Sequence, residues 1–415
     1  MAKNVVFLIH GVGVHPEGWS QAEDGPVVAL SKAAEYYPGF SAQEPLSGAI
    51  EFVEIRYDDI FDAIRTRWAS LAESLNAGSL PVATPEILGK ITGAIAQAGG
   101  DSPIATHVLD VGLYVGFRIV QRLVQLRVAS IMMNTIADHA DEPEGSRNYF
   151  IVAHSLGTTV AHDAIQRMAT TGWLAEADKV RGLIEGSGVE IADFERSVAR
   201  YGKNPFAPGN FKFDGLFQIA NTSRLLSQTK PAYESSVRPM FSSGPLNNAV
   251  RRFYNADHVL DPIGKFRKHR AKEAWPIAAS NFTAVDLFDI DHIHDINVHG
   301  FSHYLVHPSV HAPLLFSAAP TRFKIADYQA AMARVADGGD FPRFGSRFLD
   351  EDFRDNVESA LSKLSPNTLD QLPDSIKPKV VEYLGGVEVP GEIMDWLKTL
   401  VGLNNVLEEL KEQSS

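Results

Sequence analysis

The chain has 415 residues, of which 45% are hydrophobic and 21% charged, and its net charge is −13. This composition is typical of a globular protein with a full core, and the acidic balance argues against a nucleic-acid partner, which needs a basic face. The chain contains no cysteine, so disulfides, thiolate metal ligands and a cysteine nucleophile are excluded.

The first predicted element is a strand at residues 4–9, a run of apolar side chains typical of a parallel sheet covered by helices on both faces. Gly11 and Gly13 follow it and allow a tight turn that exposes backbone N–H groups. A dinucleotide-binding loop would need a third glycine where the sequence has Pro16. No segment here reads as a signal peptide, so we expect a cytoplasmic protein, or one exported without such a signal.

Residues 26–36 read as a helix and residues 49–57 as a second strand, and a helical insertion then occupies about 60–140. Its last helix, at 104–137, carries too many charged residues to be a membrane span. Arg118, Arg122 and Gln125 recur along it at helical spacing, which predicts one polar face. We favour a core helix; the alternative is an apolar cap over an active site, with possible peripheral membrane contact.

The centre of the chain is a predicted strand at 149–153 followed at once by a helix that begins at Leu156. Between them lies Ser155, in the pentapeptide Ala153-His154-Ser155-Leu156-Gly157. This spacing fits the nucleophile elbow G-x-S-x-G, in which a sharp strand-to-helix turn exposes a serine, with Ala153 in place of the first glycine. The alternative is an ordinary link in which the serine caps the helix.

Three further strands are predicted at 215–220, 251–255 and 282–288, and from about 320 the pattern is helical. Helices are predicted at 324–336, 350–364, 375–384 and 391–413. Strands that alternate with helices predict an α/β fold with a mostly parallel central sheet. We therefore expect a catalytic domain at 1–320 and a C-terminal helical extension at 321–415.

Acyl transfer by a serine requires a base that takes its proton, an acid that orients the base, and donors for the oxyanion. After Ser155 the chain offers Asp261 as the preferred acid, because Pro262 keeps it out of helix, with Asp257 as the alternative. Among the histidines that follow the last strand we prefer His303 as the base, after the flexible Gly300, with His299 second.

The oxyanion would be held by the backbone N–H groups of Leu156 and Val12. His10 and His154 are expected to shape this region without acting as the base. A rival hypothesis is a metal site at His292, His294 and Asp295, whose spacing suits zinc. It would leave the serine elbow unexplained, so we expect no metal and no cofactor.

These residues together resemble the α/β-hydrolase superfamily, in its lipase and esterase branch, over about residues 3–310. The segments that carry the likeness are His10 to Gly13, Ala153 to Gly157, Asp261-Pro262 and His303. Residues 255–263 and Ser302-His303-Tyr304 are also similar to the acid and histidine segments of intracellular DDHD-type phospholipases. The sequence departs from the superfamily at Ala153, and at Asn221-Thr-Ser-Arg, where many lipases carry Gly-Ser-Pro.

The resemblance implies the α/β-hydrolase fold and a serine hydrolase that cleaves a carboxylic ester through a Ser155–His303–Asp261 triad. A lipid or other apolar acyl ester is the expected substrate because of the helical insertion. The alternatives are a thioesterase or amidase that uses the same triad, and a non-catalytic scaffold that binds a partner. The sequence does not set an oligomeric state.

Overall fold

The computed structural model describes these parts of the chain: residues 3–64, 110–111, 113–114, 118–143, 145–170, 172–173, 175, 177–178, 181, 211–223, 249–258, 261, 285–290 and 299–336. By its internal contacts the chain divides into two units, residues 1–63 with 119–347 and residues 64–118 with 348–415. Nearly all described residues belong to the first unit. The predicted helices at 350–364, 375–384 and 391–413 lie outside the described residues and stay predictions.

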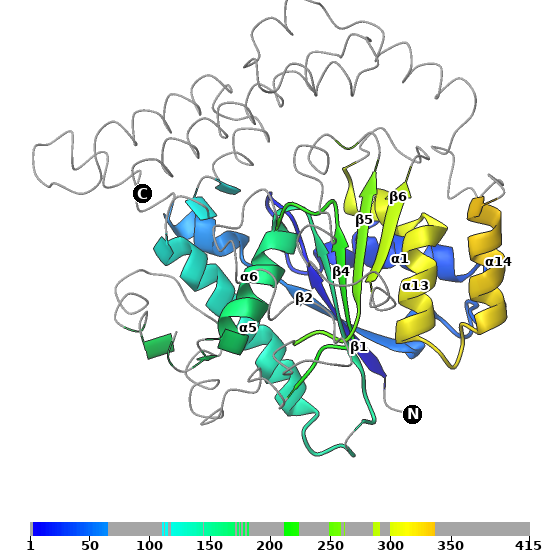
Figure 1. Ribbon diagram of the computed structural model, residues 1–415, viewed down its shortest axis with the longest axis horizontal. Helices are drawn as coiled ribbons and strands as arrows, with labels where there is room; N and C mark the ends of the chain where they lie inside the picture. The colour runs from blue at the N-terminus through cyan, green and yellow to red at the C-terminus, as the bar shows by residue number, and fades with distance from the viewer. Residues whose placement is uncertain are drawn as a thin grey trace, which may run out of the picture. The chain divides into compact units, whose positions relative to one another are not determined.

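Six described strands form one sheet in the order β2-β1-β3-β4-β5-β6, and every neighbouring pair is parallel (Figure 1). The strands are β1 (Asn4–Ile9), β2 (Ile50–Ile55), β3 (Tyr149–His154), β4 (Gly215–Ile219), β5 (Phe253–His258) and β6 (Val285–Ile290). This confirms the predicted α/β class with a parallel sheet. Because the strands are parallel, the carboxyl ends of neighbouring strands meet at one edge of the sheet.

The described helices are α1 (Pro26–Ala34), α5 (Arg118–Asp138), α6 (Leu156–Thr170), α12 (Phe301–Leu305), α13 (Pro308–Ala318) and α14 (Ile325–Ala336), with single 3₁₀ turns at Trp19–Gln21 and Leu46–Gly48. The sequence analysis missed α12 and α13, which follow the last strand. The C-terminal extension is expected from residue 321, and its first predicted helix, at 324–336, is α14, whose contacts group it with the first unit.

Helices cover both faces of the sheet. Successive strand residues point to opposite faces, and on one face residues such as Val6, Val152 and Phe217 pack in a single apolar cluster with α1, α12 and α13. Figure 1 shows α1, α13 and α14 on that side of the sheet and α5 and α6 on the other. The four central strands are buried almost throughout, which explains the continuous apolar runs in the sequences of β1 and β3.

Helix α5 is part of the core, as we favoured, and of its expected polar face Gln125 is buried while Arg122 is partly exposed. Gln125 is 1% exposed, and its Oε1 accepts a 2.6 Å hydrogen bond from Arg167 of α6. The Arg127 guanidinium is also buried and binds both carboxylate oxygens of Asp59, at 3.1 and 3.0 Å. Within the part of the chain that the structure describes, no helix combines the length and hydropathy needed to cross a membrane.

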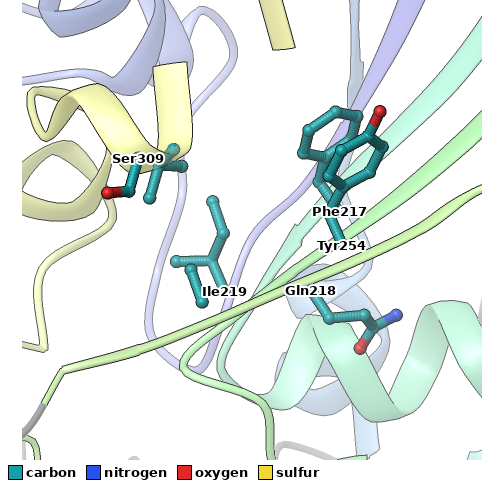
Figure 2. A pocket seen from close by; sticks show the side chains of 7 residues that line it. Phe217, Gln218, Ile219, Tyr254 and Ser309 are labelled. Carbon is teal, nitrogen blue, oxygen red and sulfur yellow. The ribbon is translucent and has the colours of Figure 1, made fainter. Parts of the chain in front are cut away.

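A small pocket lies between the sheet and the start of α13 (Figure 2). Figure 2 shows Phe217, Ile219 and Tyr254 on its side of β4 and β5, while Gln218 points to the opposite face of the sheet. The lining residues are Phe217, Gln218, Ile219, Tyr254, Ala256, Ser309 and Val310. The lining is almost entirely apolar and includes none of the predicted catalytic residues, so this pocket belongs to the packing of the core.

His311 makes the stability of this core depend on pH. Its ring is buried on α13, with Nδ1 at 3.0 Å from the carbonyl of Leu305 and Nε2 at 2.6 Å from the hydroxyl of Tyr37. A neutral ring suits both contacts, because Nδ1–H donates to the carbonyl and Nε2 accepts from the phenol. Burial lowers the pKa of His311 to about 4.

We therefore expect the free energy of unfolding to fall by up to about 3 kcal/mol as the pH drops from 7 to 4, because the unfolded chain takes up a proton at this site that the folded chain does not. Denaturant unfolding of wild type and His311→Gln across this range measures it. The difference in the free energy of unfolding between wild type and His311→Gln should change with pH. A constant difference would contradict the assignment.

Candidate active site

Ser155 occupies the sharp turn between β3 and α6. Its φ angle is 53°, in the left-handed region that a residue with a side chain rarely adopts. Strand β3 ends at His154 and α6 begins at Leu156, so one residue makes the whole reversal. Such a conformation costs on the order of 1–3 kcal/mol and persists only where its surroundings enforce it.

Hydrogen bonds to the backbone of Ser155 enforce this turn. Its N–H donates to the carbonyl of Ile219 at the end of β4, at 3.0 Å. Its carbonyl accepts from the backbone N–H of Thr158 at 2.9 Å, the hydroxyl of Thr158 at 2.6 Å and the hydroxyl of Thr222 at 2.8 Å. Gly157 allows the helix to approach β1, since a Cβ there would lie 2.3 Å from the carbonyl oxygen of His10.

His299, not His303, is the histidine bonded to Ser155. The distance from Nε2 of His299 to Oγ of Ser155 is 2.9 Å. His303 is 5% exposed, and its ring packs against that of His258 with centroids 5.0 Å apart. The structure therefore does not place the preferred His303 beside Ser155, and the alternative, His299, makes the contact with Ser155 that the base was expected to make.

The unpredicted helix α12 explains this correction. Gly300 is its extended N-cap residue, so the helix begins at Phe301 and His303 lies inside it. Its first turn carries Phe301, His303 and Tyr304 into the core. His299 precedes the cap and remains in the loop beyond the carboxyl end of β6, with a side chain 23% exposed.

Asp261 is the acid that meets this histidine. Its Oδ2 lies 2.8 Å from Nδ1 of His299, and its side chain is fully buried. The same oxygen accepts a 2.7 Å hydrogen bond from the hydroxyl of Tyr304. The Asp261 backbone N–H donates to the carbonyl of His258, which forms a turn directly after β5. The preferred acid thus lies within a Ser155–His299–Asp261 chain of hydrogen bonds.

Asp257, the alternative acid, has a different environment. It is a residue of β5 itself, and one carboxylate oxygen accepts from the side-chain amide of Asn255 at 2.8 Å. The other accepts from the backbone N–H of Asn221 at 3.3 Å. The Asn221 amide in turn donates to Asn255 at 2.7 Å. Asp257 therefore ties together the ends of β4 and β5.

His154 links β3 to the loop that carries His299. Its Nε2 lies 2.5 Å from the backbone carbonyl oxygen of His299, and its ring stacks on Phe301 with centroids 5.0 Å apart. Burial, with the nearby His299, holds the pKa of His154 well below its usual value, so the ring is neutral. Because a carbonyl can only accept, the single ring proton is on Nε2. The expectation that His154 shapes the site fits this geometry.

The loop after β1 lies directly beside the nucleophile candidate. A Cβ on Gly11 would lie 2.9 Å from the Cβ and 3.4 Å from the Oγ of Ser155, so only glycine fits there. Tyr57, just after β2, donates to the carbonyls of His10 at 2.6 Å and Gly11 at 3.3 Å. Val12, the expected oxyanion donor, is the next residue along this backbone, which Tyr57 holds in place.

The buried side chains of His10 and Asp58 pack against the loop after β1. The His10 ring stacks with the rings of His15 and Tyr57, with centroid distances of 3.8 and 4.3 Å. Its Nε2 lies 3.6 Å from Oδ1 of Asp58. Asp58 also accepts a 2.6 Å hydrogen bond from the N–H of His15. Burial alone would raise the pKa of Asp58, but the interaction with the nearby His10 ring and the hydrogen bond from the His15 N–H outweigh burial and lower the pKa to about 2.

The described residues contain no group of three or more histidine, aspartate or glutamate side chains that could hold a metal ion. The rival metal site at His292, His294 and Asp295 lies outside the described residues and stays untested. The departure at Asn221-Thr-Ser-Arg is described only up to Ser223, where Thr222 and Asn221 make the backbone-supporting bonds given above.

No model of a known protein family matches this sequence, and no curated protein matches it. Among solved structures, the chain is similar to an uncharacterized protein from Pseudomonas aeruginosa, with 11% sequence identity and a TM-score of 0.29. The alignment covers 98% of this chain but 63% of the length of that protein. A similarity of this degree supports no inference about fold or function.

The contact between His154 and the His299 carbonyl can be tested with two matched variants. His154→Phe keeps a ring against Phe301 but removes the N–H donor, whereas His154→Gln keeps an N–H donor near the position of Nε2. We expect His154→Phe to slow the reaction of Ser155 with a fluorophosphonate by about tenfold, the effect of one lost hydrogen bond. His154→Gln should stay within a few-fold of wild type.

Melting temperatures of both variants provide the control. Equal rates in the two variants would show that the hydrogen bond does not position the loop.

Asp58 should stabilise the folded protein only where it is ionised. Its pKa is lowered in the folded state, so its contribution of about 2 kcal/mol is present above pH 4 and is lost as the pH falls toward 2. We expect Asp58→Asn to lower the free energy of unfolding by about this amount at pH 7 and by roughly half as much at pH 3. Urea unfolding at the two pH values is the measurement, and a loss of equal size at both would count against a stabilising role for ionised Asp58.

Proposed function

We propose that this protein is a serine hydrolase of the α/β-hydrolase type that cleaves a carboxylic ester, with Ser155, His299 and Asp261 as its catalytic triad. The observation that carries the proposal is the unbroken pair of hydrogen bonds, 2.9 Å from Ser155 to His299 and 2.8 Å from His299 to Asp261. Nucleophile, base and orienting acid within these distances are the arrangement that acyl transfer requires.

The position of the triad in the sheet supports the same function. Strand order reverses between β1 and β3, and in open parallel sheets ligands bind beyond the carboxyl ends of the strands at such a reversal. Ser155 follows β3, and Gly11 follows β1, so the two loops that flank the reversal meet there. The acid and the base follow β5 and β6, at the same edge of the sheet.

The reaction follows from these positions. Oγ of Ser155 attacks the ester carbonyl carbon while Nε2 of His299 takes the hydroxyl proton, and Asp261 stabilises the resulting imidazolium. The backbone N–H groups of Leu156 and Val12 would hold the oxyanion. His299 then returns the proton to the leaving alcohol, which gives an acyl-enzyme. Water, deprotonated by His299, attacks the acyl carbon and releases the carboxylic acid with Ser155 restored.

Two histidines four positions apart, His299 and His303, make this proposal sharply testable. We expect Ser155→Ala and His299→Gln each to reduce hydrolysis of p-nitrophenyl esters by at least about 10³-fold, because each removes a group that works only with its partner. The matched variant His303→Gln should remain within about tenfold of wild type, since His303 packs against His258 rather than against Ser155.

Intact-mass analysis after fluorophosphonate treatment should show one adduct on wild type and none on Ser155→Ala. A chain-length series of esters, with thioester and anilide analogues beside it, then ranks the acyl chain and the bond that is cleaved. A folded wild type that takes no adduct, or a His303→Gln variant as inactive as His299→Gln, would refute the proposed triad.

A further inference from the structure

Tyr304 makes a contact with the acid that the triad does not require. Its hydroxyl is 2.7 Å from Oδ2 of Asp261 and 2.9 Å from the backbone nitrogen of His258. A backbone N–H can only donate, so the hydroxyl oxygen accepts from His258 and directs its own single proton to Asp261. Both side chains are completely buried, so water does not compete for this bond.

One carboxylate oxygen therefore carries two donors. Oδ2 of Asp261 accepts from Nδ1 of His299 at 2.8 Å and from Tyr304 at 2.7 Å. Tyr304 stays a donor at ordinary pH, because burial and the nearby charge of Asp261 hold the pKa of its phenol well above its usual value. The phenol of Tyr304 is thus a neutral donor to the same carboxylate oxygen that His299 contacts.

We propose that Tyr304 is a positioning residue that fixes Asp261 and shares its negative charge, so that His299 holds its second proton less strongly than it would beside Asp261 alone. The effect on catalysis rests on the proposed function, whereas the hydrogen bonds of Tyr304 do not depend on it. A hydrogen bond to a charged group delocalises that charge, and less of the carboxylate charge then stabilises the imidazolium. The consequence is a base that remains neutral, and able to accept a proton, at lower pH.

Other described groups around this pair remain constant in the test. The ring of His154 lies 4.8 Å from that of His299 and is neutral, as derived above. Asp257 adds a negative charge near Tyr304, and His15 adds an electrostatic effect on His154. None of these groups is altered by a change at Tyr304, so a shift in the behaviour of His299 reports the lost hydroxyl.

The test is Tyr304→Phe, with the ring of His299 followed by NMR in protein labelled with ¹⁵N-histidine and assigned with His299→Gln. We expect the titration midpoint of that ring to move up by about one pH unit, as expected when a charge-assisted hydrogen bond no longer offsets the carboxylate. The pH at which the fluorophosphonate reaction is half-maximal should move up by the same amount. An unchanged or lower midpoint would overturn charge sharing, because loss of orientation alone weakens the Asp261–His299 contact.

Two controls keep the result interpretable. Tyr37→Phe removes another buried tyrosine hydroxyl, one that bonds His311, and should change stability without moving either midpoint. If Tyr304→Phe does not fold, 3-fluorotyrosine placed at position 304 keeps the shape and strengthens the donor, and both midpoints should then move down. If wild type takes no adduct at all, the proposed hydrolase fails, while the NMR midpoint still supports or overturns the role of Tyr304.

Discussion

The left-handed turn at Ser155 is the constraint on which the rest of the site depends. It is unfavourable for a serine, and no single contact could hold it. The ladder of β4 holds its N–H, threonine hydroxyls from α6 and from the loop after β4 hold its carbonyl, and Gly157 lets the helix reach β1. The turn therefore requires both the sheet and α6 to be in place. It sets the position of the Ser155 hydroxyl, which His299 contacts.

Two buried side chains, His154 and Tyr304, hold the proposed base and acid, His299 and Asp261, near that turn. His154 binds the carbonyl of His299, and Tyr304 binds the carboxylate of Asp261, so each partner of the serine is held by a residue outside the triad. Tyr304 and His299 come from the same short stretch around α12.

Much of this architecture could be predicted from local pattern. Local patterns, of which the apolar runs at β1 and β3 were the clearest, predicted all six described strands to within a few residues, and the pentapeptide around Ser155 indicated the turn. The choice between His299 and His303 depended on where α12 begins, and five helical residues capped by Gly300 leave too weak a periodic signal. Pro262 after Asp261 indicated the aspartate that the structure places beside His299. The contacts of Tyr304 and His154 join distant segments of the chain, which no local pattern contains.

The order of the groups along the chain has a consequence for synthesis on the ribosome. Ser155 is made early, whereas Asp261 and His299 lie beyond two further strands that must add to the sheet in sequence, β4 then β5 and β6. Until about residue 305 has left the exit tunnel, Ser155 lacks its contact with His299. An emerging chain therefore passes through most of its synthesis before the hydrogen-bonded chain Ser155–His299–Asp261 can form.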